Sequence, residues 1–191
     1  MGVAVGDIME LYLIRHGKTF ANENHLYCGS TDLPLSENGV EELKTKCYTV
    51  PQDVQFVTSG MKRTQQTLRT LFGDIPYTVD TDFREIDFGI FEMKSYEQLK
   101  DNPEYQQWLE GDNFVNIPPL GESGRQMTDR VTQAVERYIK QGKNTVIITH
   151  GGVIAAVMTH LFPQEDKNIY QWQPKPGCGY IVKNGTFLTM E

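Results

Sequence analysis

The stretch TVIITHGG, from Thr145 to Gly152, decides the fold class, because it combines a strong strand signal with a polar end. Its unbroken run of β-branched residues is typical of a central strand that is buried on both faces of a parallel sheet. A second stretch has the same design, since the apolar run ELYLI (Glu10 to Ile14) leads into Arg-His-Gly at positions 15–17. Two buried strands that each end in histidine and glycine are therefore expected.

Outward from these strands, apolar runs alternate with amphipathic ones, which predicts an α/β fold. We expect a three-layer α/β/α sandwich with a mostly parallel central sheet and helices on both faces. Further strands are expected at Val54 to Thr58 and Tyr77 to Asp80, and a terminal hairpin at Gly179 to Lys183 and Thr186 to Met190, joined by a type I′ turn at Asn184-Gly185. Helices are expected at Ser36 to Cys47, Lys62 to Phe72, about Glu122 to Gln141, with Gly142 ending the helix, and Gly152 to Leu161.

The segment from about 91 to 121 breaks this alternation, because it is aromatic and rich in turn residues. We interpret it as an irregular, lid-like excursion beside the sheet, within one domain that covers residues 1–191. Tyr105, Trp108 and Phe114 could stack on a flat substrate or could close the core. The sequence leaves both interpretations open.

The bulk composition limits the partners and the compartment. A net charge of −7 over 191 residues gives no basic field for nucleic acid or an anionic membrane. Cys28, Cys47 and Cys178 form no CxxC pair, so the chain fits a reducing cytoplasm, and no apolar run reaches the roughly 18 residues of a membrane span. The oligomeric state, monomer or homodimer, and the native start, Met1 or Met9, stay open.

The strand ends carry the chemistry. Polar residues at the carboxyl ends of parallel strands line the crevice where α/β proteins bind ligands, so His16 and His150 are expected to face one pocket. Arg15 beside His16, and Arg63 after the second strand, supply guanidinium groups that suit a phosphate ester. Like-charge repulsion from arginines disfavours imidazolium, and neutral imidazole is the nucleophilic form. The glycines that follow the two histidines, Gly17, Gly151 and Gly152, are expected to let backbone N–H groups approach an anion.

A departing alkoxide needs a proton, and Glu85 is the candidate donor, with Asp87 as the competing choice. His25 and His160 match no motif and are interpreted as structural. No HxxxH or comparable ligand spacing is present, so neither a metal nor another cofactor is expected.

Together these residues resemble the signature of the histidine phosphatase superfamily, the phosphoglycerate mutase-like proteins. The resemblance covers roughly residues 10 to 160 and is carried by segments in matching order: Leu13 to Thr19 with Asn22, Asp32 to Ser36 with Gly39, Ser59 to Thr67, Glu85 to Glu92, and Thr149 to Gly152. It implies a phosphate pocket of Arg15, Asn22, Arg63, His150 and Gly151, with His16 as the phosphorylated nucleophile and Glu85 as the acid. It also implies a metal-independent reaction on a small phosphate ester.

Within the superfamily, the segment Ile86 to Gly89 departs from the glycolytic mutases, which makes mutase activity doubtful. Three short segments, Leu26 to Gly29, Phe91 to Met93 and Pro176 to Gly179, are more similar to the α-ribazole-5′-phosphate phosphatases of cobalamin biosynthesis. A mutase-type phosphotransferase and a non-catalytic module that binds phosphorylated ligands are the alternatives. Lys18 departs from the usual Glu or Gln, and either adds a cation at the pocket mouth or faces solvent.

Overall fold

A computed structural model describes residues 9–112 and 114–191 and shows one mixed six-stranded sheet. The strands are β1 (Glu10–Arg15), β2 (Gln55–Thr58), β3 (Thr78–Val79), β4 (Thr145–Thr149), β5 (Gly179–Lys183) and β6 (Thr186–Met190), in the order β3-β2-β4-β1-β5-β6. The first four strands run parallel to one another, whereas β5 pairs antiparallel with β1 and with β6. The predicted mostly parallel sheet is confirmed.

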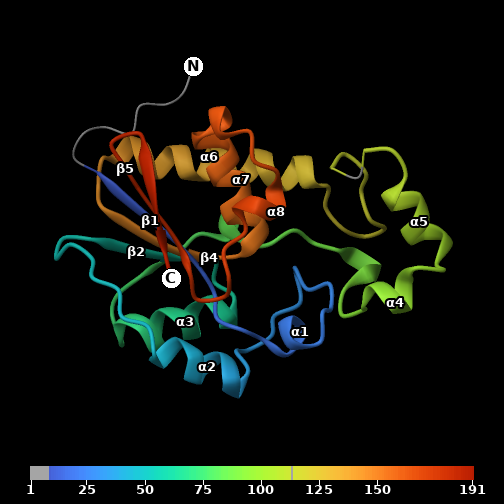
Figure 1. The fold of residues 1–191 in the computed structure, drawn as a ribbon, viewed down its shortest axis with the longest axis horizontal. Coiled ribbons are helices and arrows are strands. Elements are labelled where there is room, and N and C mark those ends of the chain that lie inside the picture. Colours follow the sequence, from blue (N-terminus) through green and yellow to red (C-terminus); the bar gives the residue numbers. More distant parts are fainter. Residues whose placement is uncertain (1–8, 113) are drawn as a thin grey trace.

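Helices cover both faces of this sheet, as predicted (Figure 1). The longer ones are α2 (Glu37–Lys44), α3 (Lys62–Phe72), α6 (Gly124–Gln141) and α7 (Gly151–Leu161); the shorter ones are α1 (Phe20–Glu23), α4 (Tyr96–Leu99), α5 (Pro103–Leu109) and α8 (Ile169–Trp172). Helices α2 and α3 lie on one face, and α6, α7 and α8 lie on the other. The structure also contains the single 3-10 turns η1 (Thr81–Phe83), η2 (Gly89–Phe91) and η3 (Pro163–Glu165).

Local chemistry sets the ends of these elements. All five residues of β4 are buried, in accord with its apolar sequence. Helix α6 begins after Ser123, whose hydroxyl accepts a hydrogen bond from the N–H of Gln126, so the helix starts two residues later than expected. It ends at Gly142, which takes the left-handed conformation with φ of 63°. Helix α2 ends at Lys44, short of the predicted Cys47, because the chain turns at Thr45.

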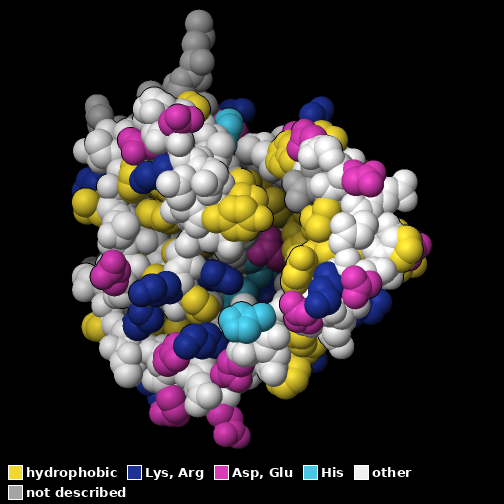
Figure 2. Space-filling view, turned by 45° about the vertical axis from the view of Figure 1, so that its right-hand side comes forward, with side chains coloured by type: hydrophobic (Ala, Val, Ile, Leu, Met, Phe, Trp, Pro, Cys, Tyr) yellow, Lys and Arg dark blue, Asp and Glu magenta, His cyan; other side chains and the backbone are white. Residues whose placement is uncertain are grey.

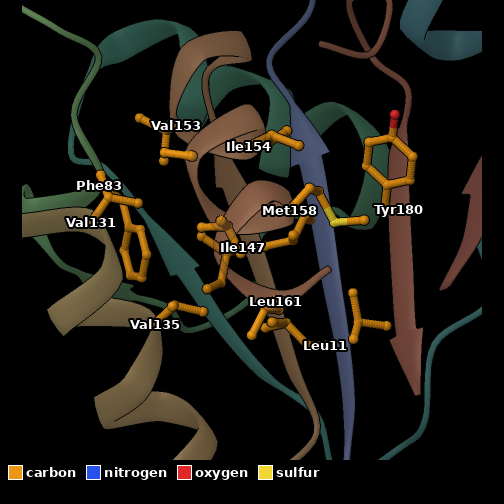
Figure 3. Packing of buried hydrophobic residues seen from close by; sticks show 14 of the residues in the cluster. Leu11, Phe83, Val131, Val135, Ile147, Val153, Ile154, Met158, Leu161 and Tyr180 are labelled. Carbon is orange, nitrogen blue, oxygen red and sulfur yellow. The ribbon is translucent and has the colours of Figure 1, made fainter. Parts of the chain in front are cut away.

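The largest apolar cluster fills the space between the sheet and helices α6 and α7 (Figure 3). Leu11 and Ile147 contribute from the strands, Val131 and Val135 from α6, and Met158 from α7. A smaller cluster on the opposite face packs Ile14, Ile148 and their neighbours against α3. Two-sided burial therefore fixes the positions of β1 and β4, the strands that lead to the histidines.

The excursion from 91 to 121 is more regular than expected. It contains two short helices, α4 and α5, which are capped by Ser95 and Asn102, and Pro103 occupies the first turn of α5. The segment was interpreted as irregular from its aromatic residues, and both helices are too short for a clear amphipathic period, so their caps were the available signal. Tyr105 is buried in a separate apolar cluster with Phe91 and Leu99, so this aromatic residue closes a local core.

Within residues 9–112 and 114–191, no helix is long and apolar enough to cross a membrane. The alternative start at Met1, with the extension through residue 8, lies outside the described residues.

Replacement of Ile147 by Ala should lower the free energy of unfolding by about 3 kcal/mol, because the side chain is fully buried in the largest cluster. Urea titration followed by circular dichroism measures this loss. Leu188 lies on strand β6 and is 68% exposed, so Leu188→Ala is a matched control that should cost less than about 1 kcal/mol. Equal losses in the two variants would contradict this assignment of the core.

Candidate active site

His16 and His150 lie side by side because their strands are neighbours. β1 and β4 pair in parallel with Arg15 opposite Thr149, and each histidine is the next residue along its strand. The N–H of His16 donates to the carbonyl oxygen of Thr149 over 2.9 Å. The two ring centroids are 5.1 Å apart with an interplanar angle of 64°. Figure 2 shows a hollow in this face, with histidine and acidic side chains inside it, Lys and Arg on one rim and hydrophobic side chains on the other.

The hydrogen bond of His16 defines which ring nitrogen carries the proton and which carries the lone pair. Nδ1 lies 2.7 Å from the carbonyl oxygen of Gly17, which can only accept, so Nδ1 carries the proton. The lone pair therefore resides on Nε2. The N–H of Gly17 donates to Oγ1 of Thr67 over 3.0 Å, which holds the peptide between His16 and Gly17, next to the peptide whose carbonyl orients the ring. This glycine N–H is consequently used inside the protein and is not offered to an anion, contrary to our expectation for the glycines after the strands.

His150 is held at both ring nitrogens. Nε of Arg63 donates to Nδ1 over 3.3 Å, and Nε2 lies 2.9 Å from Oγ of Ser59. Because Nδ1 accepts, the proton of a neutral ring resides on Nε2 and is donated to Ser59. Ser59 follows β2 directly, so its position at the carboxyl end of a parallel strand is the sequence signal for this contact. A direct contact between His150 and phosphate remains a prediction.

The surroundings keep both imidazoles neutral. Burial lowers the pKa of His16 well below its usual value, and the charges of Arg63 and Arg15 lower it further. The pKa of His150 is lowered for the same reasons, by burial first and by Arg63 next. The nearby cations therefore disfavour protonation, as expected from the sequence.

Arg63 projects from the first turn of α3 and is only 1% exposed. Nη1 and Nη2 donate to the carbonyl oxygens of Thr31 and Gly29 over 2.8 and 2.7 Å. The loop that carries these carbonyls is in turn bound by the carboxylate of Glu92, which accepts hydrogen bonds from the N–H groups of residues 29, 30 and 31. Glu92 was not singled out from the sequence, because its role depends on a loop about 60 residues earlier in the chain.

Arg15 carries an unpaired donor. Its Nη1 donates to the carbonyl oxygen of Pro174 over 2.8 Å, whereas Nε is buried without a hydrogen-bond partner among the described residues. The guanidinium packs against Gly151, where a Cβ atom would lie 3.1 Å from Cζ of Arg15. Gly151 is also the first residue of α7, so its N–H has no acceptor within the helix. Donors of this kind suit an anionic ligand.

Of the two candidate acids, Glu85 lies at the site. Its Oε2 accepts a hydrogen bond from the N–H of Gly152 at the start of α7, over 3.0 Å, next to His150 in the fold. The carboxylate of Asp87 instead accepts hydrogen bonds from Oγ of Ser30 and the N–H of Gly89. Asp87 therefore stabilises the turn that follows Glu85.

Two other residues from the motif have local partners. Asn22 forms a capping box with Thr19, in which its Oδ1 accepts from the N–H of Thr19 over 3.0 Å, so only its Nδ2 is left to donate to a ligand. Nζ of Lys18 is 2.6 Å from Oε1 of Glu42 on α2, in an exposed ion pair.

His160, interpreted as structural, pairs with Glu136 between α7 and α6. No group of three or more His, Cys, Asp or Glu residues is arranged to hold a metal ion within the described part of the chain.

Comparison with known proteins identifies the family. The model of the histidine phosphatase superfamily (branch 1) matches residues 11–185. The chain belongs to this superfamily. It is 28% identical over 192 residues to the adenosylcobalamin/α-ribazole phosphatase of Escherichia coli (strain K12), covering 95% of this chain and 94% of that one.

Two solved structures place this histidine phosphatase among others of the same architecture. The α-ribazole phosphatase from Shigella flexneri superposes with a TM-score of 0.79 at 27% identity, covering 96% of this chain and 95% of that one. The phosphoglycerate mutase from Thermus thermophilus superposes with a TM-score of 0.74 at 28% identity, covering 96% of this chain and 99% of that one. The predicted phosphoglycerate mutase-like fold is confirmed.

The lowered pKa of His16 and His150 should make this histidine phosphatase less stable in mild acid. Below pH of about 6.5 the unfolded chain binds protons at these rings and the folded chain does not, so each ring costs up to about 1.4 kcal/mol per pH unit. Urea unfolding at pH 7.5, 6.5 and 5.5 measures the slope, which His16→Asn should reduce. An NMR titration of His16 with a midpoint at or above 6.5 would disprove the assignment.

Proposed function

We propose that this protein is a metal-independent phosphomonoesterase that works through a phosphohistidine on Nε2 of His16. The observation that carries the proposal is a neutral imidazole whose Nδ1–H is bound by the Gly17 carbonyl, beside the buried guanidinium group of Arg63 and the partly buried one of Arg15. That arrangement provides a nucleophile and an anion site in the same hollow. Arg15, Arg63, His150, Asn22 and Gly151 are the proposed phosphate contacts.

In the first step the Nε2 lone pair of His16 attacks phosphorus and the bond to the ester oxygen breaks. The electron pair of that bond stays on the oxygen, which takes a proton from Glu85 and departs as an alcohol. In the second step a water molecule attacks the phosphohistidine, gives a proton to Glu85, and the N–P bond electrons return to Nε2. Inorganic phosphate leaves, and both residues recover their starting forms.

Charge stabilisation in this proposal comes from arginines. The phosphoryl group carries negative charge on its equatorial oxygens during transfer, and fixed guanidinium donors stabilise that charge. The buried Nε of Arg15, which has no partner among the described residues, supports this role, since a phosphate oxygen would satisfy it. Nη1 and Nη2 of Arg63 each have a second N–H group, and in this proposal these groups donate to the same ligand.

The purified protein should hydrolyse p-nitrophenyl phosphate in the presence of EDTA, and His16→Ala should abolish the release of p-nitrophenolate. His160→Ala is a matched control, because His160 pairs with Glu136 away from the nucleophile, and it should retain activity within about threefold of wild type. Rapid quenching should trap acid-labile phosphate on the wild-type chain and none on His16→Ala. Activity that requires added magnesium would refute the metal-independent mechanism.

For the substrate, we propose α-ribazole 5′-phosphate, in a cytoplasmic step of cobalamin biosynthesis. Supporting this choice, the relative from Escherichia coli and the structure from Shigella flexneri both carry the name α-ribazole phosphatase. The mutase-type alternative keeps the same phosphohistidine but transfers the group to a second hydroxyl, and the likeness to the Thermus thermophilus mutase favours it. The presence of both a nucleophile and an acid at the site disfavours a non-catalytic binding module.

Incubation with α-ribazole 5′-phosphate should release inorganic phosphate with a kcat/KM at least about tenfold above that for 3-phosphoglycerate. With 3-phosphoglycerate, the proposal predicts slow phosphate release and no 2-phosphoglycerate, as measured by NMR of phosphorus. Formation of 2-phosphoglycerate would favour the transferase instead.

A further inference from the structure

The segment that carries Glu85 is bound by one side chain of α6, that of Arg130. Nη1 of Arg130 donates to the carbonyl oxygens of Asp82 and Arg84, each over 2.7 Å. Nη2 donates to the carbonyl oxygen of Glu85 itself over 3.2 Å. One guanidinium group therefore contacts the backbone of the acid and of two residues before it.

The guanidinium is itself held in one orientation by Glu122. Nε and Nη2 of Arg130 donate to the two carboxylate oxygens of Glu122, each over 2.7 Å, in a bidentate pair that is partly buried. The N–H of Glu122 also donates to the carbonyl oxygen of Asp87, so the pair contacts the acid segment on both sides of Glu85. Bidentate pairs of this geometry have less freedom than single ion pairs.

We propose that Arg130 is a positioning residue for the general acid, an inference that rests on the proposed function. A carboxyl group delivers its proton only from hydrogen-bonding distance of the leaving oxygen, and a displacement of about 1 Å can cost two orders of magnitude in rate. The side chain of Glu85 has few anchors of its own, namely the N–H groups of Gly152 and Ile86. The position of the carboxyl group therefore depends on the position of the Glu85 backbone, which the hydrogen bonds of Arg130 hold in place.

Arg137 distinguishes a positioning role from simple stabilisation. It lies on the same helix two turns later, on the same face, and pairs with Asp80 and Asp82 at 3.1 and 2.8 Å. These ion pairs join α6 to the same segment, but within the described part of the chain Arg137 makes no hydrogen bond to residue 84 or 85. Arg137→Gln is therefore a matched control for the loss of one charged contact between α6 and this segment.

The test compares leaving groups. Arg130→Gln should lower kcat for glycerol 2-phosphate, whose alkoxide needs a proton, by about 10- to 100-fold, and should change kcat for p-nitrophenyl phosphate by less than about threefold. Glu85→Gln should show the same selectivity to a greater extent, and Arg137→Gln should show none. Combination of Arg130→Gln with Glu85→Gln should add no further selective loss, since both changes act on one proton transfer.

Arg130→Lys, which keeps the charge and loses the bidentate geometry, extends the test to a variant with a smaller effect on folding. It should show an intermediate selectivity, and thermal melts confirm that the assayed variants are folded. Equal losses on both substrates, or the same selectivity in Arg137→Gln, would overturn the positioning role while leaving the proposed function intact. An inactive wild-type protein, or a Glu85→Gln variant without selectivity, would instead refute the proposed function itself.

Discussion

The site depends on two guanidinium groups, that of Arg63 fully buried and that of Arg15 partly buried, which form no ion pair with a carboxylate among the described residues. Arg63 donates to two carbonyl oxygens and an imidazole nitrogen, and Arg15 to one carbonyl oxygen. Burial lowers the pKa of both groups, although the nearby charge of Glu85 opposes the effect. Neutral acceptors satisfy hydrogen bonds but leave the net charge uncompensated, which is costly in a medium of low polarity. An anion that enters the hollow supplies the missing charge, so the same burial that lowers the pKa of the histidines also favours phosphate.

Charged side chains outside the hollow hold the two backbone segments that position Arg63 and Glu85. The carboxylate of Glu92 accepts the N–H groups of residues 29 to 31, and that loop then directs carbonyl oxygens at Arg63. On the other side, Arg130 donates to carbonyl oxygens and so fixes the segment of Glu85. In each case a charged side chain orients a backbone segment. The loop held by Glu92 then directs its carbonyl oxygens toward Arg63, and the segment held by Arg130 carries the side chain of Glu85.

The parts of this arrangement that follow from strand burial could be predicted from the sequence, and the parts that depend on loop packing could not. The run Thr145 to Thr149 is found as β4 with the expected bounds, and the parallel pairing of β1 with β4 brings His16 and His150 together. The hydrogen bond from Arg63 to His150 joins residues 87 positions apart through the packing of α3, and no local pattern reports it. Helices α4 and α5 also depend on tertiary packing and were not predicted. Each is short, and α5 is stabilised by its cap and by the burial of Tyr105 in a local apolar cluster.

The carbonyl of Gly17 connects this geometry to the reaction. Attack through Nε2 moves positive charge onto the imidazole ring, and a ring in a buried, cationic site tolerates that charge poorly unless an acceptor takes part of it through Nδ1–H. The Gly17 carbonyl is such an acceptor at 2.7 Å, and the preceding peptide, which joins His16 to Gly17, is held by a hydrogen bond from its N–H to Thr67. A Cβ at position 17 would lie 2.6 Å from Cδ1 of Leu43, so a larger residue there would have to displace this buried side chain of α2. The glycine after the histidine thus serves to orient the ring and to stabilise the charge that forms on it.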